Sequence, residues 1–231
     1  MNKNPDVISS ILSSPIEVQE EEIYNASTFG VGLTPFYTSI AIWVGILLAC
    51  AILNLKTEEH FAEECDVTPI QEHFGKMLLI LTIGIIQALI VSLGDIIILG
   101  IKPENFMLFI GTALLVAVTF TMVIYGLVSV FGNIGKAIAV IIMVFAIAGT
   151  GGLYPIETNP HIFAVLKPLW PFTYAINMYR EAIAGPYWDG VMYNFKAMII
   201  FIIAFLCLVI LKKPMRIVSE GMSEKFEETG L

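Results

Sequence analysis

The sequence predicts an all-α membrane protein with five transmembrane helices and a re-entrant or interfacial helical hairpin on the outer side. Of its 231 residues, 57% are hydrophobic and only 14% are charged, whereas soluble domains are about one-quarter charged. Five apolar runs approach or reach the length of about 20 residues that crosses a bilayer. Before the last run, residues 149–190 combine prolines with aromatic side chains, a mixture typical of the membrane interface rather than of a span.

The apolar runs divide the chain into a polar lead-in, a membrane domain and a tail. Residues 1–34 are polar and acidic, and residues 212–231 are polar again, so the transmembrane domain is expected over residues 35–211. The expected spans are Pro35–Leu55, Met77–Leu99, Phe106–Phe131, Ala137–Gly152 and Val191–Leu211.

Basic residues near the ends of the runs set the expected orientation. Lys212, Lys213 and Arg216 follow the last span, and short segments rich in lysine and arginine stay in the cytoplasm. Counting back through the spans places residues 56–76 in the cytoplasm and residues 153–190 outside. We therefore expect a multi-pass protein of the plasma membrane, with the N-terminal lead-in outside and the C-terminal tail in the cytoplasm.

The outer hairpin, residues 153–190, is expected to contain one amphipathic helix. Pro171 suits the start of this helix and Gly185 suits its end. Arg180 of this helix can pair with a neighbouring carboxylate or reach lipid headgroups, and the sequence leaves both possibilities open. The candidate contact residues of the hairpin are Tyr154, Pro155, Glu157, Arg180 and Glu181.

Polar residues within the second and third runs are candidates for a substrate path or for contacts between helices. A charged carboxylate at the bilayer centre costs about 2.5–3.5 kcal/mol, so Asp95 must face protein or water. Asp95 lies about one turn from the end of its run. It is therefore either a snorkelling or capping carboxylate or a group on a substrate or proton path. Gly84, Ala88 and Ser92 stand four residues apart and permit close helix approach. The full candidate set is Gln87, Ser92, Asp95, Thr121 and Tyr125.

The charged loop at residues 56–76 is the expected docking surface for a partner protein. Its candidate residues are Glu59, His60, Phe61, Glu63 and Glu64, whose spacing matches neither HExxH nor paired CxxC. A solvated or partner-docking face is therefore favoured over a metal site.

Enzymatic and nucleic-acid functions are disfavoured. The sequence offers no catalytic constellation, cofactor motif or metal site, and its net charge of −8 argues against nucleic acid as a partner. Residues Gly132–Ala137 lack the first glycine and the Ser/Thr of a phosphate loop and join two apolar runs. We expect a turn there, no ATPase site within this chain, and the lipid bilayer as its principal surroundings.

Several segments together carry a resemblance to a known family. They are Gly149–Glu157, Pro168–Ala175, Arg180-Glu181, Pro35–Tyr37 with Trp43–Gly45, Gln87–Asp95 and Leu127–Ala137. On these segments the chain resembles the C-terminal membrane region of the phage-infection-protein (YhgE/Pip) family, within the ABC-type-2 exporter permeases. The resemblance implies a six-helix permease fold, of which this chain looks like the last five helices. It also implies an ATPase-docking role for residues 56–76.

Two functions follow from this resemblance. The first is a permease subunit that transports an unidentified substrate, as a homodimer or with a chain that supplies the missing first helix, and with a separate ATPase subunit. The second is a surface receptor used in phage adsorption, or a secretion-system assembly scaffold without transport activity. Replacing Asp95 by Asn separates them, because only a transport path needs that carboxylate.

Overall fold

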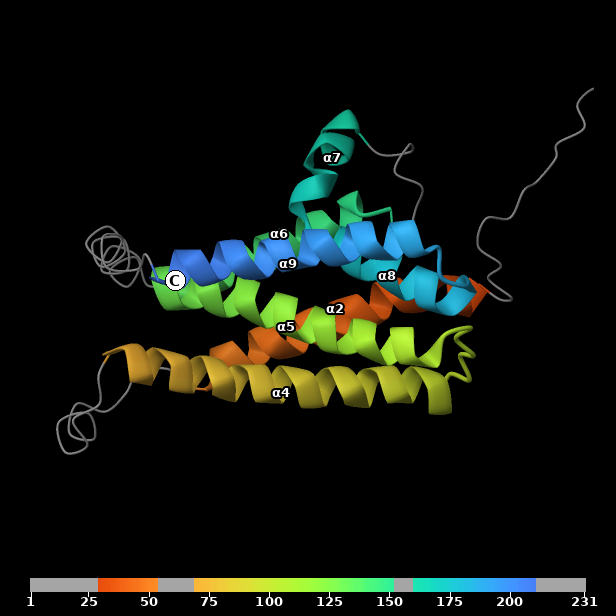
Figure 1. Ribbon diagram of the computed structural model, residues 1–231. Helices are drawn as coiled ribbons and strands as arrows, with labels where there is room; N and C mark the ends of the chain where they lie inside the picture. The colour runs from red at the N-terminus through yellow and green to blue at the C-terminus, as the bar shows by residue number, and fades with distance from the viewer. Residues whose placement is uncertain (1–28, 54–68, 152–159, 211–231) are drawn as a thin grey trace, which may run out of the picture.

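The computed structural model describes residues 29–53, 69–151 and 160–210, and every regular element in these ranges is helical (Figure 1). The elements are α2 (Phe29–Ile52), α4 (Pro69–Ile97), α5 (Phe106–Phe131), α6 (Asn133–Gly149), α7 (His161–Leu166), the 3-10 turn η2 (Lys167–Leu169), α8 (Pro171–Ala184) and α9 (Trp188–Ile210). Four of these helices, α2, α4, α5 and α9, are long and apolar enough to cross a membrane, and α6 is shorter, with 17 residues. The predicted all-α membrane fold is confirmed.

Several helices begin before the apolar runs that predicted them. α4 starts at Pro69 rather than residue 77, and α6 covers Asn133–Gly149 rather than residues 137–152. α2 starts six residues before Pro35 and keeps this proline inside the helix. The Ser39 hydroxyl donates to the Pro35 carbonyl at 2.7 Å, a bond between a side chain and the carbonyl four residues earlier in the same helix. Hydropathy alone marks the lipid-embedded part of a helix, not its polar continuation.

The spanning helices lie side by side along one long axis (Figure 1). We name its two ends by what they hold. The hairpin end holds residues 98–105 and the α8–α9 connection, and the turn end holds the sharp α5–α6 turn at Gly132, which has a φ of 57°. The side of the membrane that each end faces stays a prediction.

Helix α8 is re-entrant, since it enters the bundle without crossing it. Eleven of its 14 residues are buried, and it packs against α2, α5 and α9. Its last carbonyls are tied to the segment before α5, where Glu104 N donates to Ile183 O and Asn105 N to Ala182 O at 3.2 and 3.1 Å. The sequence predicted a re-entrant or interfacial hairpin, and in the structure its α8 arm is re-entrant and forms part of the core, while α7 projects away from the bundle (Figure 1).

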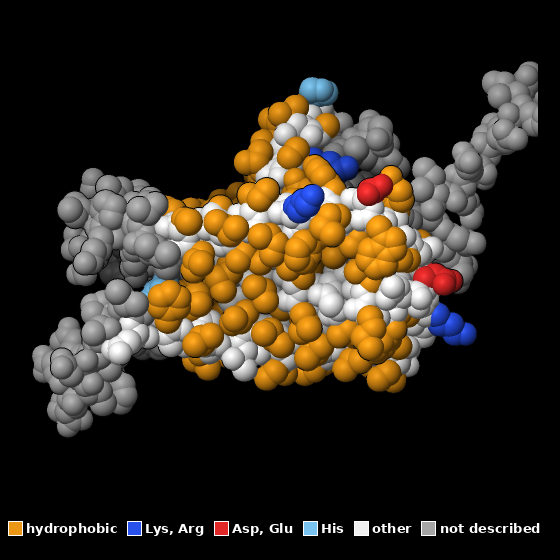
Figure 2. All heavy atoms as spheres, in the orientation of Figure 1, with side chains coloured by type: hydrophobic (Ala, Val, Ile, Leu, Met, Phe, Trp, Pro, Cys, Tyr) orange, Lys and Arg blue, Asp and Glu red, His pale blue; other side chains and the backbone are white. Residues whose placement is uncertain are grey.

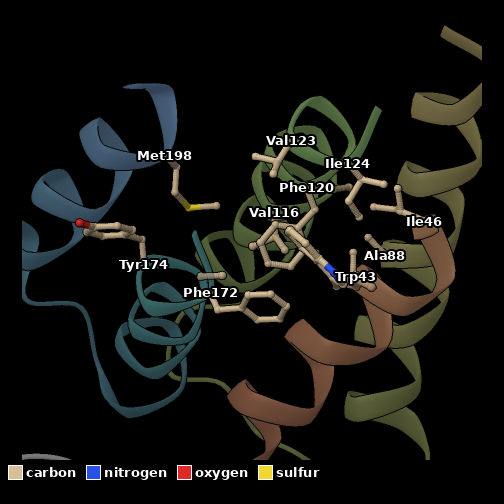
Figure 3. Packing of buried hydrophobic residues seen from close by; sticks show 14 of the residues in the cluster. Trp43, Ile46, Ala88, Val116, Phe120, Val123, Ile124, Phe172, Tyr174 and Met198 are labelled. Carbon is tan, nitrogen blue, oxygen red and sulfur yellow. The ribbon is translucent and has the colours of Figure 1, made fainter. Parts of the chain in front are cut away.

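The core is centred on three aromatic rings from three helices. Trp43 of α2, Phe120 of α5 and Phe172 of α8 lie with ring centroids 4.8–5.0 Å apart (Figure 3). The indole Nε1 of Trp43 also donates to the Ala139 carbonyl of α6 at 3.3 Å. This cluster therefore joins α2, α5, α6 and the re-entrant helix.

The side of the bundle is covered by apolar side chains, and charged side chains are sparse on the face shown in Figure 2. α4 exposes Leu78, Ile86 and Ile90, and α9 exposes Ile200 and Ile203. Such a continuous apolar surface belongs in hydrocarbon rather than in water. The protein is thus a multi-pass membrane protein.

Candidate functional site

The candidate site is the set of polar side chains through which α4 contacts α2, α5 and α8. These contacts lie among the spanning helices, where lipid cannot replace a lost hydrogen bond. The residues predicted from the second and third apolar runs all belong to it: Gln87, Ser92, Asp95, Thr121 and Tyr125.

Asp95 joins α4 to α2. The Thr38 hydroxyl donates to Asp95 Oδ2 at 2.6 Å, and the residue is only 7% exposed. In the described ranges this hydroxyl is the only side chain that hydrogen-bonds the carboxylate, and no lysine, arginine or histidine pairs with it. A buried acid held by one neutral donor is an expensive arrangement in a membrane. Asp95 is therefore the strongest candidate for a functional group among these residues.

Ser92 joins the same face of α4 to the re-entrant helix. Its Oγ lies 3.2 Å from the Tyr179 hydroxyl, and both residues are buried. The Tyr179 ring packs edge-on against Phe109 of α5, with centroids 5.1 Å apart. Because Ser92 and Asp95 are three residues apart, one turn of α4 contacts α8 and α2 at once. This junction of three helices lies next to the hairpin end.

Gln87 and Thr121 lie at close approaches between helices nearer the middle of α4. The Gln87 amide donates to the Ala41 carbonyl at 2.9 Å and fills the space where a Cβ on Gly45 would stand. A Cβ on Gly84 would lie 2.9 Å from Thr121 Oγ1, and this buried hydroxyl has no hydrogen-bond partner. Glycine at these two positions lets α2 and α5 approach α4 closely.

Tyr125 lies at the turn end, far from Asp95. Its hydroxyl donates to the His73 carbonyl at 2.9 Å and lies 3.2 Å from His73 Nδ1, with the two rings 4.9 Å apart. His73 and Asp95 are 22 residues apart on α4, which corresponds to about 33 Å at 1.5 Å per residue. The predicted residues therefore form three separate contacts along α4 rather than one pocket.

Two predicted hairpin residues have structural partners. Arg180 Nη2 donates to the Gly151 carbonyl at 3.1 Å, which ties α8 to the end of α6. Glu181 is buried, and its Oε2 accepts from Tyr187 N at 2.8 Å, just before α9 begins. A carboxylate at this position satisfies a free amide and complements the helix dipole.

The remaining predicted residues lie outside the described ranges. They are Tyr154, Pro155 and Glu157 of the hairpin and Glu59, His60, Phe61, Glu63 and Glu64 of the loop. Where the chain is described, no three His, Cys, Asp or Glu side chains cluster as metal ligands would.

The partners of the predicted residues were not identified from the sequence. Thr38, Tyr179 and His73 lie 52 to 87 residues from the side chains that they contact. Gly45 lies 42 residues from Gln87, which packs against it. Thr38 could have been noticed as a hydroxyl inside an apolar run, but nothing in its spacing points to Asp95.

The chain was compared with known families and proteins. A family model described as "ABC-2 family transporter protein" matches residues 1–211. The chain belongs to the ABC-2 transporter family. It is also 28% identical over 180 residues to "Uncharacterized protein YhgE" of Bacillus subtilis (strain 168), a match that covers 78% of this chain and 23% of that relative. The chain thus spans about a quarter of the length of the relative, and no solved structure matches it.

Membership of the ABC-2 family confirms the resemblance predicted from the sequence. The protein is accordingly a membrane transporter component, from a family of transporters rather than of classical enzymes. Every contact of the candidate site lies within the residues matched by the ABC-2 family model.

Proposed function

We propose that this chain is the permease subunit of an ABC-type-2 exporter and that the hairpin end faces the outside of the cell. The observation that carries the proposal is the re-entrant helix α8, which occupies the hairpin end of the bundle. It is held to α4 by the Ser92–Tyr179 contact, one turn from the Thr38–Asp95 bond. A helix that fills one end of a bundle without crossing it would close a path at that end, and opening this path would break the Ser92–Tyr179 contact and the backbone bonds of Glu104 and Asn105 to α8.

In this proposal, other chains hydrolyse ATP and complete the assembly of the transporter. Gly132–Ala137 forms the turn between α5 and α6, with Gly132 capping both helices, and not a strand-to-helix phosphate loop. A separate ATPase subunit would dock on residues 56–76 on the cytoplasmic side. The chain would act as a homodimer or with a chain that supplies a further helix.

The proposal is tested by comparing what cells export. A strain that lacks the protein is complemented with the wild type, with Asp95→Asn or with Asp189→Asn at equal expression, and cells and medium are profiled by untargeted mass spectrometry. Asp189 is the control, because it is an exposed carboxylate near the same end of the bundle. We expect the wild type and Asp189→Asn to restore the distribution of at least one compound and Asp95→Asn to fail. If no compound differs between the deleted and complemented strains, the export function is wrong.

A photo-crosslinking residue in place of His60 tests the partner separately. It should capture an ATPase subunit, whereas the same residue in place of Ile162 on α7 should not. Capture of no nucleotide-binding protein would contradict the assignment of residues 56–76.

One observation favours the alternative of a surface receptor or assembly scaffold. The projecting α7–η2 segment exposes Ile162, Val165 and Leu169, each by about 60%, which is a surface suited to contact. In that case, replacing Ile162 and Val165 by Ser abolishes phage adsorption or assembly, while Asp95→Asn has no effect on either.

A further inference from the structure

Helix α9 carries a lysine on the face that points away from the protein. Val191, Asn194 and Met198 are buried against the bundle. At 100° per residue, Lys196 lies on the opposite side of the helix. It shares that side with Tyr193 and Ile200, which are 65% and 66% exposed. Lys196 itself is exposed, so its ammonium group lies in the apolar surface of a spanning helix.

This lysine has no internal partner. In the described part of the chain no ion pair or hydrogen bond reaches Lys196. The nearest acid on the same face is Asp189, seven residues or about 10 Å towards the hairpin end. The Asp189 carboxylate instead lies beside the Tyr187 hydroxyl and raises the pKa of this exposed tyrosine. An unpaired cation on a membrane helix is costly unless an anion from outside the chain meets it.

The geometry of a helix directs the ammonium group towards the hairpin end. Lys196 is eight residues into α9, about 12 Å below Trp188. Side chains on a helix lean towards its N-terminus, and lysine extends its charge to the membrane interface. Tyr187 and Trp188 are both exposed at the start of α9, and such aromatic residues mark the headgroup level. The charge of Lys196 is therefore aimed at the headgroups of the leaflet at the hairpin end.

We propose that Lys196 binds the phosphate of an anionic phospholipid in this leaflet. The exposed side chains of Met192, Tyr193 and Ile200 then contact the acyl chains. A second copy of the chain is a poorer occupant, because a two-fold contact through this face brings the two Lys196 side chains together, and like charges repel. A carboxylate on another membrane protein would suit the charge, but the position of Lys196 within reach of the headgroups favours a lipid.

The proposal is tested by the lipid selectivity of the purified full-length chain. The protein is reconstituted in phosphatidylcholine, and the association of spin-labelled phosphatidylglycerol is compared with that of spin-labelled phosphatidylcholine by electron paramagnetic resonance. The variants are Lys196→Gln, Lys196→Arg and the matched control Lys102→Gln, which removes the same charge from an exposed position in the loop at the same end. Lys196→Gln removes a charge from an apolar surface, so it should not impair folding.

We expect the wild type to prefer phosphatidylglycerol by about fivefold, the selectivity that one lysine near a membrane surface provides. Lys196→Gln should lose this preference, and Lys196→Arg and Lys102→Gln should keep it. Equal losses in Lys196→Gln and Lys102→Gln would mean that net charge alone attracts the lipid, which overturns the proposal. No preference in the wild type, or none lost in Lys196→Gln, also overturns it. So does a change in oligomeric size in Lys196→Gln, because the lysine then pairs with protein.

Discussion

Replacing Gly45 by Ala tests whether Gln87 locks α4 to α2. The new Cβ would occupy the position of the Gln87 amide, which then has to move and give up its hydrogen bond to the Ala41 carbonyl. Hydrogen bonds between membrane helices contribute about 0.6 kcal/mol on average and at most about 1.7 kcal/mol. Overpacking a tight contact costs about 1–3 kcal/mol. We expect Gly45→Ala to lower the free energy of unfolding by about 1–3 kcal/mol.

The cost should disappear when Gln87 is removed first. In a Gln87→Ala background the Cβ that Gly45→Ala introduces enters the vacated space, and the higher helix propensity of alanine contributes up to about 1 kcal/mol. Gly111→Ala is the matched control, because nothing lies within 4 Å of a Cβ at that α5 position, and it should be neutral or stabilising.

Unfolding of the four variants is measured in mixed micelles with increasing SDS and followed by tryptophan fluorescence. Contacting residues give non-additive changes, whereas independent sites add within about 0.3–0.5 kcal/mol. If Gly45→Ala costs the same with and without Gln87, the amide is not the obstacle and the reasoning is wrong.

Three further changes are measured in the same unfolding assay. Thr38→Val leaves the buried Asp95 without its donor and should cost about 1–3 kcal/mol, whereas Thr38→Ser should restore most of the loss; equal costs would contradict the role of the hydroxyl. Glu181→Ala removes the acceptor of Tyr187 N before α9 and should cost about 0.5–2 kcal/mol, and a neutral result would mean that this cap is unimportant. Gly135→Ala places a Cβ against the backbone of α5, which cannot step aside, so a cost of about 1–3 kcal/mol is expected; a stabilised variant would contradict this packing.

Element positions could be predicted from the sequence because the signals are local. The third apolar run has the same bounds as α5, Phe106–Phe131, and Pro171 and Gly185 mark the start and the cap of α8. Local signals are weaker where a helix continues beyond its apolar residues. The charged residues before Met77 hid the first two turns of α4 for that reason.

The sequence could not decide between a re-entrant and an interfacial α8, because the polar residues of this helix find partners on distant segments. The Tyr179 hydroxyl meets Ser92, Arg180 donates to Gly151, and Glu181 accepts from Tyr187. An amphipathic pattern indicates an exposed polar face only if no other element satisfies that face. Residue types along one helix also cannot reveal which neighbour they meet, so Asp95 could be selected as a candidate without its partner on α2.

Some helices of the bundle are held together by side-chain hydrogen bonds, whereas α9 is held mainly by apolar contacts. α4 is joined to α2, α5 and α8 by side-chain hydrogen bonds, which keep their strength in hydrocarbon because water does not compete for them. Beyond its first turn, α9 contacts the bundle mainly through apolar surfaces in the described ranges, such as Phe205 against Gly126 and Phe201 against the ring of Tyr174, and Tyr193 beside Tyr174 adds a polar contact. Lipid tails are as apolar as these side chains, so little is lost when α9 exchanges a protein contact for a lipid contact. Two charged residues of the spanning helices follow the same division: Asp95 is enclosed where the helices are hydrogen-bonded to one another, and Lys196 lies on the exposed side of α9.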